Sequence, residues 1–329
     1  MSKTVKPFRF FVTMILIAVM AAAVCMSASA QEGGESQGGR GEHAESAGGQ
    51  GGSTGAQADE KVQAALDEAV DKFIQDTYTD EETGTELEYS LYIPDGYEET
   101  SYPMIMFIPD STGSGLSAAQ IVSQYYGAAV WATDEDQQAH PSFVFVPAFT
   151  GVVVDDDWNT SDQIETAVKA LKAIAAEYNV DTDRLYTTGQ SMGCMTSLYL
   201  NSIYPDLFAA SLFVSGQWDI NVLKGLEEKT FFYIVSAGDS KASSGQAEVR
   251  AMFDEDSVPY TYGEWNCMDE DQNEQAQILI DEDLSANMVM FDAEFTDDSG
   301  NTQTLTHMLS FNYAYKIDAV RDWLFEQSR

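Results

Sequence analysis

Residues 189–193 read Gly189-Gln190-Ser191-Met192-Gly193, a G-x-S-x-G motif between two segments of different character. Residues 184–188 are β-prone, and residues 194–200 suit a helix because they contain neither Pro nor Gly. A G-x-S-x-G motif between a strand and a helix is typical of the nucleophile elbow, a turn so tight that small residues must flank the serine. The context therefore predicts that Ser191 is an exposed nucleophile and that the chain is a serine hydrolase.

Short apolar runs recur along the chain, and such runs are typical of buried parallel strands. They lie at residues 104–108, 143–146, 209–214 and 231–235, with a β-like segment at 87–93. Helical apolar spacing predicts helices over 58–77, over 164–178 and after Ser310, and Thr160 with Gln163 predicts a capping box before the second of these. Alternation of strands and helices predicts an α/β fold, with a mainly parallel central sheet and helices on both faces.

The first thirty residues are expected to lie outside this fold. Basic residues precede an apolar run over 10–26, and Ala28-Ser29-Ala30 follows, so residues 1–30 are predicted to be a secretory signal peptide. An uncleaved membrane anchor is the alternative, but the run is shorter than the ~20 residues that a span needs. Lipid attachment at Cys25 is a third interpretation, disfavoured by the bulky Val24 before it. After cleavage we expect no stable membrane insertion.

Residues 31–58 consist almost entirely of small and polar residues, so we expect a disordered tether rich in Gly, Ser and Glu. Such a tether after a signal peptide suits a protein held at a cell surface and a freely secreted protein equally well. Residues 59–329 are long enough for one large α/β domain or two small ones. The formal charge is −38, and without the three basic residues of the leader 13 basic residues stand against 54 acidic ones. Such a surface repels nucleic acid and anionic membranes, so neither is an expected partner.

Histidine is scarce in this chain, and a serine hydroxyl needs a base to become a good nucleophile. Only His43, His140 and His307 occur. His43 lies in the tether, and His140 precedes the strand at 143–146, whereas catalytic groups in such sheets gather at the carboxyl ends of strands. His307 precedes the final helix, so it is predicted to be the base, with an ordinary surface histidine as the alternative.

The imidazole requires a carboxylate that fixes its tautomer. Asp239 comes directly after the strand at 231–235, which gives the chain order Ser191, Asp239, His307. Asp219 and Asp254 are weaker rivals.

The oxyanion hole is expected to combine the backbone N–H of Met192 with those of Asp110 and Ser111, in the loop after the strand at 104–108. The carboxylate of Asp110 would oppose the developing negative charge, so it must turn away from the hole. Gln190, Gln217 and Trp218 are expected to bind substrate, although Trp218 could equally be a core aromatic.

Three further features allow alternative interpretations. The mature chain keeps Cys194 and Cys267, which could form one disulfide, but we expect Cys194 to be a small buried side chain rather than a nucleophile. Residues 268–286 are predicted to be an acidic surface insertion, with a lid or a cation-binding loop as the alternative. Residues 155–157 are expected to form a loop and are only weak calcium candidates. We predict no metal site and no cofactor.

The chain resembles a known group of enzymes in several stretches. The elbow motif is preceded by Tyr178-Asn179-Val180-Asp181-Thr182-Asp183-Arg184-Leu185-Tyr186 and followed by Tyr204-Pro205-Asp206-Leu207-Phe208 and Val214-Ser215-Gly216. Together these look like the secreted esterase branch of the α/β-hydrolase superfamily. That branch includes polyhydroxybutyrate depolymerase-like enzymes, feruloyl and acetylxylan esterases, and prolyl-oligopeptidase-type peptidases. The similarity is clear over residues 160–240 and looser over 87–150 and 304–327.

The resemblance implies a secreted serine esterase that acts on a small-molecule or polymer ester, with Ser191, Asp239 and His307 as its triad and no cofactor. Two positions depart from the group. Pro109-Asp110 stands where the group usually has His-Gly, and Cys194 stands where a second Gly is common. A peptidase with the same triad, or a non-catalytic binding protein on the same scaffold, are the alternatives.

Overall fold

The computed structural model describes residues 59–297 and 299–329, which belong to one compact unit, Gly55–Arg329. The predicted signal peptide (1–30), the lipid attachment site Cys25, the tether (31–58) and His43 lie outside the described residues. Among the helices of the described residues, none has the length and hydrophobicity needed to span a bilayer.

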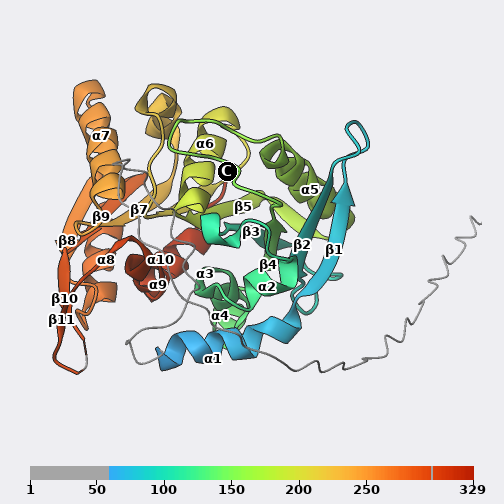
Figure 1. The fold of residues 1–329 in the computed structure, drawn as a ribbon, viewed down its shortest axis with the longest axis horizontal. Helices are drawn as coiled ribbons and strands as arrows, with labels where there is room; N and C mark the ends of the chain where they lie inside the picture. Colours follow the sequence, from blue (N-terminus) through green and yellow to red (C-terminus); the bar gives the residue numbers. More distant parts are fainter. Residues whose placement is uncertain (1–58, 298) are drawn as a thin grey trace, which may run out of the picture. The chain divides into compact units, whose positions relative to one another are not determined.

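A nine-stranded sheet forms the centre of this unit, in the order β1-β2-β4-β3-β5-β6-β7-β9-β8 (Figure 1). The pairs β1–β2 and β2–β4 are antiparallel, and every other neighbouring pair is parallel. The strands are β1 (Ile74–Thr79), β2 (Glu86–Tyr92), β3 (Tyr102–Ile108), β4 (Phe143–Ala148), β5 (Val180–Gln190), β6 (Ala210–Val214), β7 (Phe231–Ser236), β8 (Thr261–Trp265) and β9 (Ala286–Phe291), and a separate hairpin pairs β10 (Glu294–Thr296) with β11 (Thr302–Thr304). The mainly parallel sheet confirms the predicted fold class.

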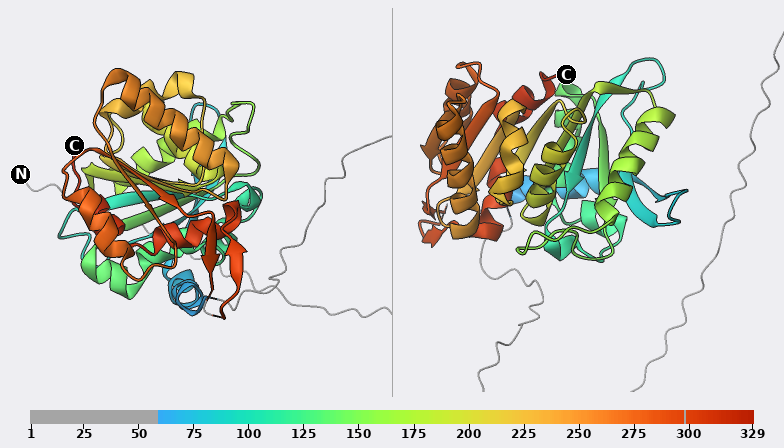
Figure 2. Two further views of the ribbon diagram at one scale, coloured as in Figure 1. Left: turned by 90° about the vertical axis from the view of Figure 1, so that its left-hand side faces the viewer. Right: turned by 90° about the horizontal axis from the view of Figure 1, so that it is seen from above.

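Helices cover both faces of the sheet, which lies edge-on between them in Figure 2. Alternate residues of β3 serve the two layers: Ile105 and Phe107 face one apolar cluster, and Met104, Met106 and Ile108 face the other. The first cluster takes in α1 (Glu60–Ala69), α2 (Ala118–Val122), α3 (Tyr126–Ala129), η3 (Val130–Ala132), α8 (Gln272–Ile280), α9 (His307–Tyr315) and α10 (Asp318–Phe325), and the second takes in α5 (Gln163–Glu177), α6 (Met192–Ile203), η4 (Ile220–Glu228) and α7 (Ser240–Asp256). The remaining helices are α4 (Asp134–Ala139), η1 (Val70–Lys72) and η2 (Ser111–Gly113).

The helix predicted over residues 58–77 is wrong in its second half. Helix α1 ends at Ala69, η1 adds one short turn, and β1 begins at Ile74. Residues 74–79 instead pair with β2, in the register Ile74↔Leu91 to Thr79↔Glu86. Pairing with a neighbouring strand overrides a helical spacing that also suits a short strand.

Two further predictions about helix ends are also wrong. Helix α5 begins after Asp162 without a side-chain cap, and the Gln163 side chain instead accepts hydrogen bonds from Thr150. The predicted final helix is two helices, because the chain turns at Lys316–Ile317 between α9 and α10. The Arg321 guanidinium of α10 donates to the Tyr315 carbonyl at the end of α9, which stabilises this break.

The acidic segment 268–286 has regular structure. It contains α8, which connects β8 to β9, two strands that the sequence analysis did not predict. Ala276 and Leu279 pack into the core, while Ile278 is 64% exposed. The segment is therefore a helical crossover between parallel strands, and most of its acidic residues are exposed.

Candidate active site

Three side chains from separate elements meet at the carboxyl edge of the sheet. Ser191 follows β5, Asp239 follows β7, and His307 is the first residue of α9. The His307 Nε2 atom lies 2.7 Å from Ser191 Oγ, and its Nδ1 atom lies 2.5 Å from Asp239 Oδ2. A neutral imidazole with its proton on Nδ1 donates to the carboxylate and accepts from the serine hydroxyl.

The turn that carries Ser191 has the geometry of a nucleophile elbow. Ser191 has φ 52° and ψ −116°, a conformation that non-glycine residues rarely adopt. A Cβ atom at Gly193 would lie 1.9 Å from the Ile108 carbonyl oxygen, and one at Gly189 would lie 2.5 Å from the Gly193 backbone. Both glycines are therefore required by the close approach of β3, β5 and α6.

Asp239 is held in place by two interactions of its carboxylate. Its Oδ1 atom accepts the Ala242 N–H at the start of α7, while its Oδ2 atom faces His307. The residue is only 7% exposed. Because helix capping and the histidine contact use different oxygens, the cap holds the carboxylate in the orientation that His307 needs.

The backbone of His307 is also fixed from inside the protein. The Ser310 hydroxyl donates to the His307 carbonyl at 2.8 Å, and Ser215 Oγ lies 2.7 Å from Ser310 Oγ. Ser215 and Ser310 are each 1% exposed. Since the Ser310 proton is used on the carbonyl, Ser215 is the donor to Ser310. This chain of hydroxyl groups ties the first turn of α9 to the segment after β6.

The predicted oxyanion donors lie on two adjacent strand ends. Met192 is the first residue of α6, where a backbone N–H has no acceptor within the helix. Asp110 and Ser111 follow β3, which pairs with β5 through Ile108↔Gly189. Asp110 is 2% exposed, and its carboxylate accepts hydrogen bonds from Thr112 and from Gln190. The carboxylate is therefore engaged by interior donors, as a usable oxyanion hole requires.

The predicted substrate-binding residues do not form an open pocket wall. Gln190 is 5% exposed and bonds to Asp110, and Trp218 is 3% exposed and packs against Tyr199. Both are interior residues, so neither offers an open surface to a substrate, and their assignment as substrate-binding residues stays a prediction. Gln217 is half-buried, and its side-chain amide donates to Asp156 Oδ1 at 3.1 Å.

The exposed aromatic side chain in this region is Trp158, which the sequence analysis missed. Its side chain is 41% exposed, its φ is 64°, and its ring packs edge-on against Trp218. Asp156 ties the same loop to Gln217 and to Lys241, whose Nζ atom lies 2.6 Å from Asp156 Oδ2. The only signal in the sequence was a tryptophan directly after three aspartates, in the loop between β4 and α5.

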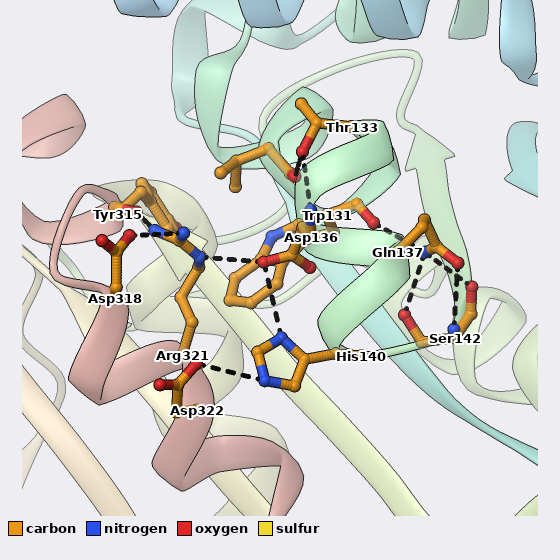
Figure 3. A network of polar contacts seen from close by, with 11 residues as sticks. Trp131, Thr133, Asp136, Gln137, His140, Ser142, Tyr315, Asp318, Arg321 and Asp322 are labelled. Atoms are coloured by element: carbon orange, nitrogen blue, oxygen red, sulfur yellow. Dashed lines mark hydrogen bonds and ion pairs between the residues drawn. The ribbon is translucent and has the colours of Figure 1, made fainter.

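His140 lies in a separate polar network between α4 and α10 (Figure 3). Its Nε2 atom is 3.2 Å from Asp322 Oδ1, its Nδ1 atom is 3.6 Å from Asp136 Oδ1, and its ring stacks on Phe325. Asp136 in turn pairs with the buried guanidinium of Arg321. His140 precedes β4, at the opposite end of the strands from Ser191.

The rival carboxylates and the cysteines have other roles. Asp219 caps η4 through Asn221, and Asp254 accepts from the Tyr260 hydroxyl. In the part of the chain that the structure describes, Cys194 and Cys267 are free and buried, so the suggested disulfide between them is not formed. Burial raises the pKa of the Cys194 thiol, and it raises the pKa of Cys267 to about 12, so both remain protonated thiols.

Within residues 59–297 and 299–329, no group of three or more His, Cys, Asp or Glu is placed to hold a metal ion. In the acidic loop after β4, Asp155 accepts hydrogen bonds from Asp157 and Asn159 of its own turn, which hold its pKa below the usual range. That carboxylate therefore organises the loop.

The sequence matches no protein-family model and no curated protein. Solved structures are similar in fold. A thermostable esterase is 23% identical with a TM-score of 0.58, over 79% of this chain and 64% of that one, so the chain spans less than two thirds of it. The feruloyl esterase module from Clostridium thermocellum, solved with sinapinate, is 14% identical with a TM-score of 0.51, over 76% of this chain and 87% of that one. A fluorophosphonate-binding serine hydrolase of Staphylococcus aureus is 10% identical with a TM-score of 0.50, over 77% and 98%. The described residues of this chain therefore have the α/β-hydrolase fold.

Proposed function

We propose that this protein is a secreted serine hydrolase that cleaves carboxylic esters, with Ser191 as nucleophile, His307 as general base and Asp239 as the carboxylate that orients His307. The observation that carries the proposal is the pair of contacts made by one imidazole, 2.7 Å to Ser191 Oγ and 2.5 Å to Asp239 Oδ2. The fold of known esterases supports ester hydrolysis as the reaction class.

In the first half-reaction, Ser191 Oγ attacks the ester carbonyl carbon while His307 Nε2 takes the hydroxyl proton. The resulting oxyanion accepts hydrogen bonds from the backbone N–H groups of Met192 and Ser111. Collapse of the tetrahedral intermediate breaks the ester C–O bond, and His307 returns the proton to the departing alcohol. An acyl group then remains on Ser191.

In the second half-reaction, a water molecule gives its proton to His307 Nε2 and attacks the acyl carbon. Collapse of the second tetrahedral intermediate returns the proton to Ser191 and releases the carboxylic acid. The Asp239 carboxylate keeps the Nδ1 proton in place and stabilises the imidazolium that forms in both steps. No group besides these residues and water is needed for the atoms to balance.

The substrate class is best sought among small acyl esters and aromatic acyl esters. Trp158 offers an exposed ring on the loop that Asp156 ties to Gln217 and Lys241, and the feruloyl esterase module of similar fold was solved with an aromatic acid. Polymer esters and peptides are the remaining candidates. Secretion is part of the proposal, through cleavage of the predicted signal peptide after Ala30.

Hydrolysis of p-nitrophenyl acetate, p-nitrophenyl butyrate, methyl ferulate and a peptide p-nitroanilide tests this proposal, with Ser191→Ala as the matched control. We expect turnover of at least one ester and its loss in the variant. Turnover of the anilide alone would indicate a peptidase. A folded protein that turns over none of them would indicate a binding protein on a hydrolase scaffold.

A further inference from the structure

Asp110 is a buried carboxylate in the loop that follows β3, and each of its oxygens has interior partners. Oδ1 accepts the Thr112 N–H at 2.8 Å, and Oδ2 accepts the Gln190 side-chain N–H at 2.9 Å. The hydroxyls of Thr112 and Tyr125 lie 2.5 and 3.1 Å from Oδ1 and 2.7 Å from each other. Two hydroxyl protons serve these three contacts, so at least one of them reaches the carboxylate.

These hydrogen bonds join the two backbone segments that would stabilise an oxyanion. Asp110 directly precedes Ser111 on the loop after β3, and Gln190 directly precedes Ser191 and Met192 at the end of β5. The bond between Asp110 and Gln190 therefore connects the two donor segments at the level of their side chains. Tyr125, just before α3, fixes the same carboxylate from a third segment.

The loop itself has little freedom to move. A Cβ atom at Gly113 would lie 2.8 Å from Pro109 Cβ and 3.2 Å from the Tyr125 hydroxyl. Asp110 caps η2, which begins at Ser111. The direction of the Ser111 N–H is thus set by the cap, because the capping residue fixes the first turn of the helix.

We propose that Asp110 is a positioning residue: its carboxylate, together with Gln190, holds the loop after β3 so that the Ser111 N–H faces the oxyanion formed on the acyl carbon. This inference rests on the proposed function. Asp110 is 2% exposed, so its carboxylate needs interior partners. Hydrogen bonds from interior donors compensate the carboxylate, and the same hydrogen bonds make the loop rigid.

Gln190 provides a way to separate the anchoring hydrogen bonds from the charge. Its Oε1 atom is buried and has no hydrogen-bond partner among the described residues, while its Nε2 atom donates to Asp110. In Asp110→Asn the new side-chain amide can donate to Gln190 Oε1 once the Gln190 amide rotates by half a turn. The anchor then survives without its charge, whereas Asp110→Ala removes the anchor entirely.

The test compares wild type, Asp110→Ala and Asp110→Asn in kcat and KM for p-nitrophenyl acetate, and in affinity for a trifluoromethyl ketone, which forms a tetrahedral oxyanion adduct. We expect Asp110→Ala to lower kcat by about a hundredfold, the scale of losing one oxyanion donor, with KM changed by less than about threefold. The ketone should bind weaker by a similar factor. Asp110→Asn should keep at least about a third of kcat, since its hydrogen bonds remain.

Asp80 supplies a matched control for the structural cost of losing a buried aspartate. It is 3% exposed, accepts the Glu82 N–H at 2.9 Å and accepts from Lys169 at 2.9 Å, in the turn between β1 and β2. Asp80→Ala should lower the melting temperature and leave kcat and ketone affinity unchanged. If Asp110→Ala does not fold, Gln190→Met cuts the same bridge from β5, and we expect it to lower kcat with little change in KM.

Three results would overturn the inference: an unchanged kcat in Asp110→Ala, or in Gln190→Met if the alanine variant does not fold; a change confined to KM; or an Asp110→Asn variant as slow as Asp110→Ala. Wild-type activity and fluorophosphonate labelling distinguish this failure from a failure of the proposed function. If the wild type is active and Asp110→Ala has an unchanged kcat, only the inference is contradicted. A wild type that neither reacts with the probe nor hydrolyses esters sinks the proposed function and the inference with it.

Discussion

Two histidine–aspartate pairs lie at opposite ends of the central strands. His307 has Asp239 on Nδ1 and the Ser191 hydroxyl on Nε2. His140 has carboxylates near both nitrogens, Asp136 at 3.6 Å and Asp322 at 3.2 Å. The first imidazole therefore faces an alcohol whose proton it can accept, while the second faces a carboxylate near each of its nitrogens.

The two histidines also differ in how their rings pack and in how exposed they are. The His140 ring stacks on Phe325 with an interplanar angle of 3°, and its network includes the buried Arg321. It borders a cavity of about 540 Å³ that none of the site residues lines. The His307 side chain is 38% exposed beside a strained serine. A cavity and an aspartate are thus not enough for a hydrolytic site, since a positioned nucleophile is also required.

Removing the imidazole should produce the largest contrast between the two pairs. For His307→Ala we expect kcat for p-nitrophenyl esters to fall by about 10⁴- to 10⁶-fold, because Ser191 loses its base. His140→Gln should keep kcat within about twofold, because this histidine touches no reacting group. Steady-state kinetics on both purified variants checks the contrast, and equal losses would show that the comparison is wrong.

The carboxylate of the active pair should matter almost as much as the imidazole. Asp239→Asn should lower kcat by about 10⁴-fold, because an amide beside Nδ1 favours the wrong tautomer of His307. Asparagine is also a good helix cap, so α7 should stay intact and the unfolding free energy should change by less than about 1 kcal/mol. Kinetics and thermal unfolding measured together test this. A stable variant with wild-type kcat would remove Asp239 from the site.

The His140 pair should respond to mutation in stability rather than in activity. Arg321→Met leaves the carboxylate of Asp136, which is 2% exposed, without its guanidinium partner. We expect a loss of about 3–5 kcal/mol in unfolding free energy with kcat unchanged. The double variant Asp136→Leu with Arg321→Met should recover most of that loss. The unfolding free energies of both variants, measured by chemical denaturation, test this prediction. An Arg321→Met protein as stable as wild type would contradict it.

The smallest effect on kcat is expected from removing the Ser310 hydroxyl, which holds the backbone of His307. Ser310→Ala removes the hydroxyl that donates to the His307 carbonyl, and it should lower kcat by about three- to tenfold, in line with about 1 kcal/mol for a hydrogen bond. Ser202→Ala is the matched control, because the Ser202 hydroxyl donates to the Leu198 carbonyl within α6. Wild-type kcat in Ser310→Ala would show that α9 needs no such tie.

The sequence predicted the parts of this site that depend on local or ordered features. The elbow is a local motif, so Ser191 could be found directly. His307 followed from the scarcity of histidine, and Asp239 followed from its position after an apolar strand. The structure brings these three side chains together, while their catalytic roles stay a prediction. The α/β fold was predictable because buried parallel strands are continuous apolar runs.

The features that the sequence did not predict depend on contacts between distant segments. Gln190 was assigned to substrate because it adjoins Ser191, but neighbouring side chains at a strand end point to different sides, and Gln190 faces Asp110. Trp158 is exposed on a loop where its backbone has a positive φ and where Asp156 contacts the distant Lys241. Neither feature follows from hydrophobic periodicity. The strand at residues 74–79 was not predicted for a similar reason. Its sequence also suits the end of a helix, and only its pairing with β2 identifies it as a strand.

Mass spectrometry of the protein after reaction with a fluorophosphonate tests the central claim most directly. The account predicts one phosphonyl adduct on the wild-type protein, mapped to Ser191 by peptide analysis. It predicts a much slower reaction in His307→Ala, an unaltered rate in His140→Gln and no adduct in Ser191→Ala. A folded wild-type protein without an adduct, an adduct on another residue, or a His307→Ala variant that reacts at the wild-type rate would contradict it.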